Sequence, residues 1–197
     1  MIGKLIPLRR RTGATAEMTD EALVAAGAAR DPSALAALYD RHGRDVHRFV
    51  VRLRGVDDHV VDDLVQDTFV QAYAAAARFR GGSTVRTWLF AIASNLARLH
   101  VRGEVRRRAR GQVYLERNDT ARAQPDAEAE RRELLERMTA ALGTLPHDQR
   151  VAFLMCDVEE ARGIDVAKAL GVRQGTLYRR LHDARRALRA AVLGDEP

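Results

Sequence analysis

The sequence predicts an all-α protein built from two small helical domains that a flexible linker joins. Several segments repeat apolar residues at helical spacing, and no alternating strand pattern of useful length appears. A polar stretch at 111–127 loses that period and separates the helical segments into two groups. The last group carries a helix-turn-helix pattern. A length of 197 residues is enough for two such domains.

Composition excludes several classes of protein. The one cysteine, Cys156, cannot form an internal disulfide, so a disulfide-stapled secreted domain is excluded. No apolar run reaches the roughly 18 residues of a membrane span, and the apolar start of the chain is too short and too charged for a signal peptide. We therefore expect a cytoplasmic protein with no direct membrane insertion.

Arginine dominates the positive charge. Lys and Arg total 33 against 27 Asp and Glu, and only Lys4 and Lys168 are lysines. Two explanations are open at this point: a GC-rich genome, or contact with phosphates and base edges, which suits the planar guanidinium group. The positions of the arginines in the chain must decide between them.

The first helical domain is expected at 23–110, after a flexible extension at 1–22. A helix begins near Ser33, and Gly43 is expected to bend or break it. The apolar stripe of this helix contains Leu35, Leu38, Tyr39, Val46, Phe49, Val50 and Leu53. Asp57 and Asp58 indicate the next helix start, because acidic side chains suit the positive end of the helix dipole.

The strongest helical pattern of the chain follows that start. Its apolar face contains Val61, Leu64, Val65, Thr68, Phe69, Ala72, Tyr73 and Ala76. Its opposite face is acidic and polar, with Asp62, Asp63, Gln66, Asp67 and Gln71. Gly81 and Gly82 end the pattern, and Ser83 or Thr84 can cap the following helix. The apolar face of that helix is expected to hold Trp88, Leu89, Ile92, Leu96 and Leu99.

The second helical domain is expected at 128–193. A helix starts near Glu128 and stops at Gly143, and Pro146 suits the first turn of the next helix. A helix-turn-helix pattern begins at Gly163, where small Ala167 lets a second helix cross closely and Gly171 permits a left-handed turn. The core of this motif is expected to contain Val166, Leu170, Val172, Leu177 and Leu181, and Ala184 and Leu188 continue its inner face.

The outer face of the last helix is strongly basic. It carries Arg173, Tyr178, Arg179, Arg180, His182, Asp183, Arg185, Arg186 and Arg189. A helix of about 10–12 Å diameter fits the major groove of B-DNA, where its first residues reach bases and flanking arginines hold phosphates. The alternative without DNA binding is a short helical hairpin whose arginine face is simply solvated.

Five segments, taken in order and spacing, resemble one family. In the first domain they are Asp63-Leu-Val-Gln-Asp-Thr-Phe69, Arg78-Phe-Arg-Gly-Gly-Ser83 and Trp88-Leu-Phe-Ala-Ile-Ala-Ser-Asn95. In the second domain they are Leu145-Pro-His-Asp-Gln-Arg150 and Gly175-Thr-Leu-Tyr-Arg-Arg-Leu-His-Asp-Ala-Arg185. The first set resembles region 2 and the second set region 4 of the bacterial sigma-70 family, in its small extracytoplasmic-function group. The resemblance covers about residues 23–192.

The resemblance implies an initiation factor rather than an enzyme. Such a factor binds core RNA polymerase and promoter DNA, with a region 2 helical bundle and a region 4 helix-turn-helix domain. It implies no cofactor, no metal and no small-molecule substrate. An anti-sigma protein commonly holds such factors inactive, and the tether also allows a closed, silent form in which the domains pack together.

The resemblance also implies a role for particular residues. Core polymerase would be bound by Asp63, Leu64, Gln66, Asp67 and Phe69. The −10 element would be met by Phe79, Arg80, Ser83, Trp88, Phe90, Asn95, Arg98, Arg102 and Arg106, with Phe79, Phe90 and Asn95 near a pocket for a flipped base. The −35 element would be read by Arg173, Gln174, Thr176, Tyr178, Arg179, Arg180, His182 and Arg185. For Phe79 and Trp88, core packing is the alternative.

Several positions depart from the family pattern. Glu160-Ala-Arg-Gly163 replaces the usual opening of the first motif helix, and Arg179 and Asp183 stand where Ser and Arg are frequent. An Asp on a DNA-facing helix repels phosphate or accepts a hydrogen bond from cytosine. These departures concern the −35 sequence that is read, not the fold.

Two other classes of function compete with this interpretation. An enzyme is disfavoured, because no phosphate-binding glycine loop and no paired His or Cys ligands occur in the sequence. A helix-turn-helix regulator that binds duplex DNA alone remains the alternative function, although no dimerisation helix is evident. Cys156 lies among apolar residues and is expected to be a buried hydrophobe, with a redox switch as its alternative.

Overall fold

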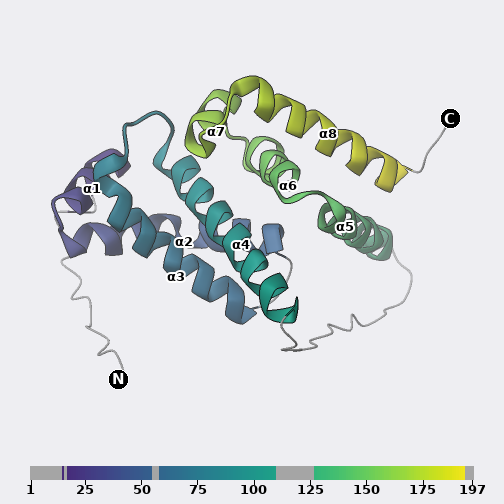
Figure 1. Cartoon of the computed structure of the whole chain (residues 1–197), viewed down its shortest axis with the longest axis horizontal. Helices are drawn as coiled ribbons and strands as arrows, with labels where there is room; N and C mark the ends of the chain where they lie inside the picture. The colour runs from purple at the N-terminus through teal and green to yellow at the C-terminus, as the bar shows by residue number, and fades with distance from the viewer. Residues whose placement is uncertain (1–14, 16, 55–57, 110–126, 194–197) are drawn as a thin grey trace.

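The computed structural model describes residues 15, 17–54, 58–109 and 127–193, and all regular structure in these ranges is helical. The first group contains α1 (Asp20–Ala28), α2 (Pro32–Arg54), α3 (Asp58–Ala75), the 3₁₀ turn η1 (Ala76–Arg78) and α4 (Val85–Ala109). The second contains α5 (Ala127–Thr144), α6 (His147–Phe153), the π-helical turn η2 (Leu154–Val158), α7 (Gly163–Leu170) and α8 (Gln174–Leu193). The predicted all-α class is confirmed (Figure 1).

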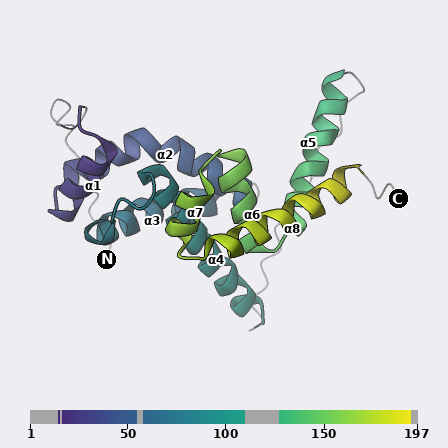
Figure 2. The ribbon, with the colours of Figure 1, turned by 90° about the horizontal axis from the view of Figure 1, so that it is seen from above.

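The two groups of helices lie against each other. Helix α4 contacts α2 and α3 on one side and α7 on the other, and η2 contacts α2. Helix α5 projects from the rest of the molecule and packs on α8 (Figure 2). Helix α4 is therefore covered on two sides, once by α2 and α3 and once by α7.

Two helices differ from the sequence-based expectation. Helix α1 begins at Asp20, capped by the Thr19 hydroxyl at 3.2 Å from the Ala22 amide, so the expected extension at 1–22 ends inside a helix. Helix α2 continues without a break through Gly43, which is buried on the same side of the helix as its neighbours His42 and Val46. Of Ser83 and Thr84, the two candidate caps of α4, Thr84 caps the helix. Its Oγ1 accepts a hydrogen bond from the Thr87 amide at 3.1 Å.

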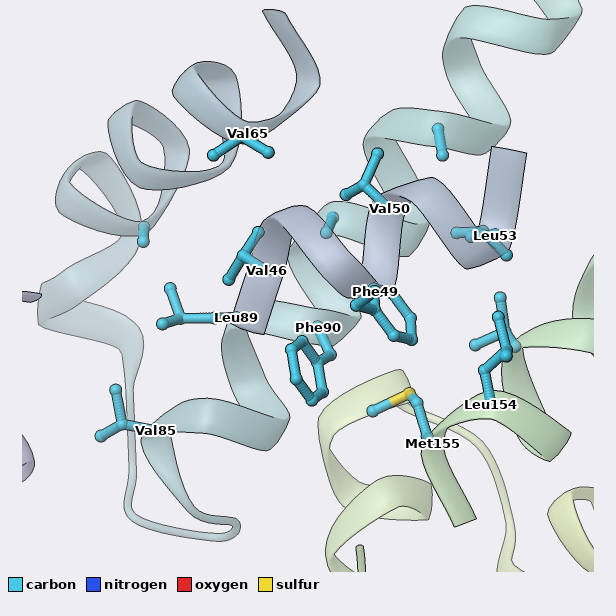
Figure 3. Packing of buried hydrophobic residues seen from close by; sticks show 14 of the residues in the cluster. Val46, Phe49, Val50, Leu53, Val65, Val85, Leu89, Phe90, Leu154 and Met155 are labelled. Carbon is cyan, nitrogen blue, oxygen red and sulfur yellow. The ribbon is translucent and has the colours of Figure 1, made fainter. Parts of the chain in front are cut away.

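One apolar core runs through both groups of helices. Phe49 and Leu53 of α2 and Phe90 of α4 belong to the same buried cluster as Leu154 and Met155 of η2 (Figure 3). The prediction for the α3 stripe is confirmed: Val61, Leu64, Val65, Thr68, Phe69, Ala72 and Ala76 are buried and Tyr73 is half-buried. For α4 the prediction was partly wrong, since Leu99 is 57% exposed whereas Phe90 is fully buried. The core therefore uses a second face of α4.

The helix-turn-helix motif forms as predicted. Gly171 ends α7 with φ +65°, ψ 31°, which is the left-handed conformation. The expected inner face is buried at Val166, Ala167, Leu177, Leu181, Ala184 and Leu188. The turn and the inner face together leave the other side of α8 free for contact.

Gly171→Ala is expected to lower the free energy of unfolding of this domain by about 1–2 kcal/mol, because an L side chain is strained in the left-handed region. A Cβ atom at Gly171 would meet no atom within 4 Å, so the effect is conformational and not steric. Urea denaturation followed by circular dichroism measures it. Gly143→Ala in α5 is the control: it also meets nothing within 4 Å, and without a left-handed φ it should leave stability unchanged or raise it.

Candidate nucleic-acid and partner interfaces

The outer face of α3 is exposed at Asp63, Gln66 and Asp67. Leu64 and Phe69, expected beside them at a partner, are only 4% and 3% exposed and belong to the core. The helical period explains the difference, because these two positions face α2 and α4 when the polar ones face solvent. Only the three polar residues of the predicted polymerase-binding set therefore reach the surface.

The loop before α4 brings two aromatic rings together. Phe79 and Trp88 are half-buried, with ring centroids 4.9 Å apart, and both pack on the core. Arg80 in the same loop is exposed, and the half-buried Ser83 hydroxyl donates to the Thr84 carbonyl at 3.2 Å. Each ring is thus partly exposed, as a contact with DNA requires, and also packs on the core, as the alternative interpretation predicted.

Phe90 is placed differently from the expectation that it lies near a flipped base. Its side chain is 0% exposed and stacks on Phe49, with ring centroids 4.6 Å apart. The Arg86 guanidinium lies 4.7 Å from the Phe90 ring centroid. In this arrangement no base can contact Phe90, because helices of both halves enclose the ring.

The exposed side of α4 holds the other residues expected at the −10 element. Asn95 is exposed, and its Oδ1 accepts a hydrogen bond from Arg98 at 3.0 Å. Arg102 is exposed one turn further along. The side chain of Arg106 lies outside the described part of the structure. Asn95, Arg98 and Arg102 therefore follow one side of the helix at intervals of about one turn.

The outer face of α8 and the turn before it gather the residues expected at the −35 element. The exposed ones are Arg173, Gln174, Tyr178, Arg179, His182 and Arg185, and Thr176 and Arg180 are half-buried. Tyr178 lies against the start of α7, where a Cβ atom at Gly163 would come within 2.7 Å of its hydroxyl oxygen. The glycine at this unusual motif position thus makes room for the Tyr178 ring.

Arg185 is held by a neighbouring carboxylate. Its Nε and Nη2 atoms donate to the two oxygens of Asp157 at 2.8 and 2.6 Å, which ties α8 to η2. The hydrogen bonds to Asp157 raise the pKa of Arg185 above its usual value. Arg185 therefore braces the domain, in addition to the DNA contact that the resemblance implies.

Cys156 lies next to this pair. Burial raises the pKa of its thiol to about 11, with the Asp157 carboxylate acting in the same direction. A thiol with so high a pKa is a poor nucleophile at neutral pH, since the thiolate is the reactive form. Cys156 is half-buried against the core, and not fully buried as the sequence suggested.

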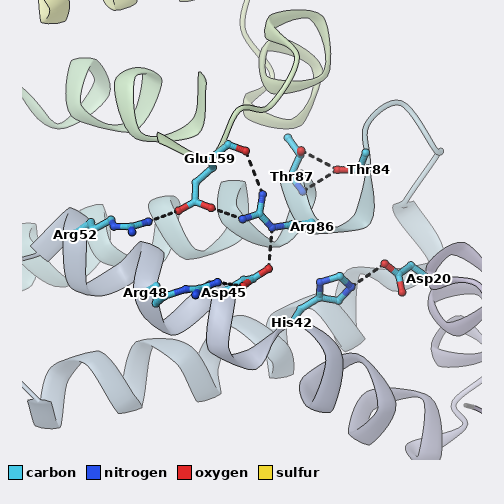
Figure 4. Close-up of polar contacts among 9 residues, drawn as sticks. All are labelled: Asp20, His42, Asp45, Arg48, Arg52, Thr84, Arg86, Thr87 and Glu159. Carbon is cyan, nitrogen blue, oxygen red and sulfur yellow. Dashed lines mark hydrogen bonds and ion pairs between the residues drawn. The ribbon is translucent and has the colours of Figure 1, made fainter. Parts of the chain in front are cut away.

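A charged network between the two groups of helices is visible only in the structure (Figure 4). Glu159, with a side chain 6% exposed, accepts hydrogen bonds from Arg52 of α2 at 2.7 Å and from Arg86 of α4. Arg86 also donates to the Glu159 carbonyl at 3.2 Å and to Asp45 at 2.9 Å. Burial raises the pKa of Asp45, but hydrogen bonds from Arg86 and Arg48 outweigh it and lower the pKa below its usual value. Ion pairs therefore join all five side chains of this network.

The start of α6 is also attached to the first group of helices. Arg150 donates to the Leu53 carbonyl at the end of α2 at 2.8 Å. The His147 Nε2–H donates to the Ser94 carbonyl of α4 at 3.1 Å. Burial lowers the pKa of His147, which keeps the imidazole neutral at pH 7. Both contacts depend on the two groups of helices staying together.

No helix in the described ranges is long and apolar enough to cross a membrane.

Comparison with known proteins matches both groups of helices to one family. The chain matches the family models of sigma-70 region 2 over residues 38–107 and sigma-70 region 4 over residues 135–188. It is 35% identical over 181 residues to the ECF RNA polymerase sigma factor SigC of Mycobacterium tuberculosis, spanning 89% of this chain and 92% of SigC. SigM of the same species is 34% identical over 192 residues, spanning 92% of this chain and 88% of SigM. A third relative, SigE of Mycolicibacterium smegmatis, is matched over only 59% of its length, at 31% identity over 77% of this chain.

Two solved structures align with most of the chain. The structure of CnrH in complex with the cytosolic domain of CnrY has a TM-score of 0.64 and 28% identity, covering 90% of this chain and 99% of that one. The structure of the sigma factor RpoE in complex with the anti-sigma factor NepR from Bartonella quintana has a TM-score of 0.57 and 28% identity, covering 78% and 92%. With both family regions in one chain and relatives matched along nearly its whole length, the protein belongs to the extracytoplasmic-function group of the sigma-70 family of RNA polymerase sigma factors.

Proposed function

We propose that this sigma factor divides promoter recognition among three surfaces. The exposed face of α3 binds core RNA polymerase, the loop at 79–83 and the exposed side of α4 engage and melt the −10 element, and α8 reads the −35 element. The two working units are the segments 23–110 and 128–193, joined by 111–127. The observation that carries the proposal is the basic outer face of α8 over a fully buried inner face.

The chemistry of α8 suits duplex DNA. Arg173, Arg179, Arg186 and Arg189 are exposed on this face, and their guanidinium groups can bind phosphate or the O6 and N7 acceptors of guanine. Tyr178, next to Arg179, adds an aromatic side chain that is 50% exposed. Residues near the start of a recognition helix reach base edges, so Arg179 and Tyr178 are placed to specify sequence and Arg189 to hold phosphate.

The chemistry of α4 suits a strand that leaves the duplex. Phe79 and Trp88 offer half-buried rings on which an unstacked base can lie, and stacking offsets part of the few kcal/mol that unpairing costs. Asn95 can hydrogen-bond a base edge, while Arg98 and Arg102 hold the backbone. In its role as an initiation factor the chain binds and orients, and we propose no catalytic residue.

The face of α3 suits a protein partner. It is acidic and polar, and it stays exposed while the opposite face fills the core. A basic helical surface of the polymerase would complement it in charge and shape. We also propose an anti-sigma protein as a partner, because both aligned structures are complexes and one of them names an anti-sigma factor. Acting with the polymerase on the chromosome places the chain in the cytoplasm.

Reconstitution tests the function directly. Core polymerase supplemented with the purified chain is expected to start transcription at discrete promoters, mapped by the 5′ ends of the RNA. The alternative, a regulator that acts without polymerase, predicts a sequence-specific shift of duplex DNA by the chain alone and no new start sites. That result would replace the proposed function.

Asp63→Ala together with Gln66→Ala is expected to weaken binding to core polymerase about tenfold or more, because both side chains are exposed on the proposed contact face. Fluorescence anisotropy of the labelled chain with core polymerase measures the affinity. Binding of the −35 duplex by the same variant should be unaffected, and equal loss of both would contradict the division of surfaces.

A control removes exposed polar side chains elsewhere. Asp40→Ala on α2 and Glu21→Ala on α1 delete two carboxylates from exposed positions outside α3. Their affinity for core polymerase is expected to equal that of the unmodified chain.

A further inference from the structure

The first residue of α7 is a glycine that the backbone does not require. Of the glycines in the described part of the chain, Gly81 and Gly171 have a positive φ and Gly163 does not, so any L residue could adopt its conformation. What the position requires is space. A Cβ atom at Gly163 would lie 2.7 Å from the Tyr178 hydroxyl oxygen and 3.1 Å from both Cε1 and Cζ of that ring. The glycine is therefore explained by the neighbouring tyrosine.

The Tyr178 ring leans from α8 onto α7 with its hydroxyl end. Helices α7 and α8 pack against each other (Figure 1), and the atoms nearest to a Cβ at Gly163 are Oη, Cζ and Cε1. This corner of the ring is thus covered by the start of α7. Tyr178 is nevertheless 50% exposed, so much of the side chain stays open. The ring edge opposite the covered corner consists of carbon, and it is the part that a ligand can meet.

The open ring edge lies within the face of α8 proposed to read the −35 element. Gln174 and His182 are exposed one helical turn before and after Tyr178, on the same side of the helix. The distinctive apolar group of the major groove is the C5-methyl group of thymine, and apolar side chains recognise it by contact. A carbon edge held at this place suits that methyl group, whereas the neighbouring arginines suit guanine and phosphate.

We propose that Tyr178 reads the methyl group of a thymine in the −35 element, and that Gly163 is the positioning residue that seats the ring for this contact. The proposal rests on the proposed function for the role of α8. Gly163 touches no base itself, and it acts by leaving room for the hydroxyl end of the ring. The departure of this chain from the family pattern at Gly163 is thereby linked to the residue that it carries at 178.

A thymine-to-uracil scan tests the methyl contact, because deoxyuridine lacks the methyl group but keeps every hydrogen-bonding group. Each thymine of the −35 element, on either strand, is replaced in turn in a promoter mapped by reconstitution. Competition binding by core polymerase with the full-length chain gives the affinities. The unmodified chain is expected to lose about three- to fivefold at one thymine, the value of one buried methyl group. Tyr178→Ala should abolish the difference at that thymine, and Tyr178→Phe should keep it.

Gly163→Ala tests the seat. It is expected to reduce the same difference to less than about 1.5-fold although Tyr178 is still present, because the new Cβ displaces the ring. Adding Tyr178→Phe removes the atom at 2.7 Å and should restore a difference of at least about twofold. Two controls keep the full difference: Arg189→Ala, which weakens binding of every duplex, and Gly143→Ala, whose Cβ meets nothing within 4 Å.

Thermal denaturation of the free chain tests the same packing without DNA. Gly163→Ala is expected to lower the melting temperature when Tyr178 is present. In the Tyr178→Ala background it should leave the melting temperature unchanged or raise it, because only the ring opposes the new Cβ and alanine favours a helix. An equal change in both backgrounds would overturn the role assigned to Gly163.

The results that contradict the proposal differ from those that contradict the proposed function. A polymerase complex that distinguishes −35 sequences but senses no thymine methyl group overturns the proposal, and so does a preferred −35 element without an A·T pair. Gly163→Ala with the full methyl difference overturns the seat. A complex of core polymerase and unmodified chain with no −35 preference at all would instead contradict the role proposed for α8.

Discussion

Phe90→Ala is expected to lower the free energy of unfolding by about 3–5 kcal/mol, the cost typical of emptying a buried aromatic site. The ring is fully buried, stacks on Phe49 and lies under the Arg86 guanidinium, so its removal leaves a cavity and deletes the cation–π contact with Arg86. Thermal and urea denaturation followed by circular dichroism measure the loss. Phe90→Leu keeps an apolar side chain at the site and should cost less, about 1–2 kcal/mol.

The same variant separates two roles for this ring. The family resemblance places Phe90 near a flipped base, whereas the structure places it in the core. A base-contacting role predicts an unchanged melting temperature and a defect in promoter opening, measured by permanganate reactivity of unpaired thymines. That combination of results would contradict the core role described here.

Arg179→Ala is expected to reduce the affinity of the polymerase complex for its preferred −35 sequence by about 1–3 kcal/mol, or 5- to 150-fold, and to relax discrimination at one or two base pairs. The Arg179 side chain is exposed on the basic face of α8, six residues after the exposed Arg173. Competition binding with a panel of single-base-pair −35 variants measures both the affinity and the discrimination.

Arg189→Ala is the matched control for Arg179. It removes the same charge from an exposed position further along α8, where phosphate contact is expected. Its affinity should fall by a similar amount for every sequence, with discrimination unchanged. If Arg179→Ala behaves in the same way, α8 does not read bases at this position.

The amphipathic helices could be predicted from the sequence because each buries one dominant face. The stripe of α3 and the inner face of α8, including Leu177 and Leu181, are buried as the spacing predicts. Helix α1 escaped detection, since its short run of alanines and glycine has no sharp apolar side. Leu99 was misassigned because α4 packs on two sides, and periodicity alone identifies only one.

The candidate surfaces could be predicted by residue type, but not the contacts that cover them. Arg180 and Arg185 are recognisable as basic positions on α8, yet their pairing with Asp148 and Asp157 depends on how helices meet. Glu159 and Arg86 are 73 residues apart, and no local pattern links positions at that separation. Such long-range pairing of charges follows from how the two groups of helices pack, which the sequence does not specify segment by segment.

The apolar surface shared by the two groups of helices would carry a cost if they separated. Leu154 and Met155 are 1% and 0% exposed because residues of α2 and α4 cover them. Opening would present a contiguous patch of this kind to water, and such patches promote aggregation. Any form of the protein in which the two groups of helices separate therefore needs another surface to cover these residues.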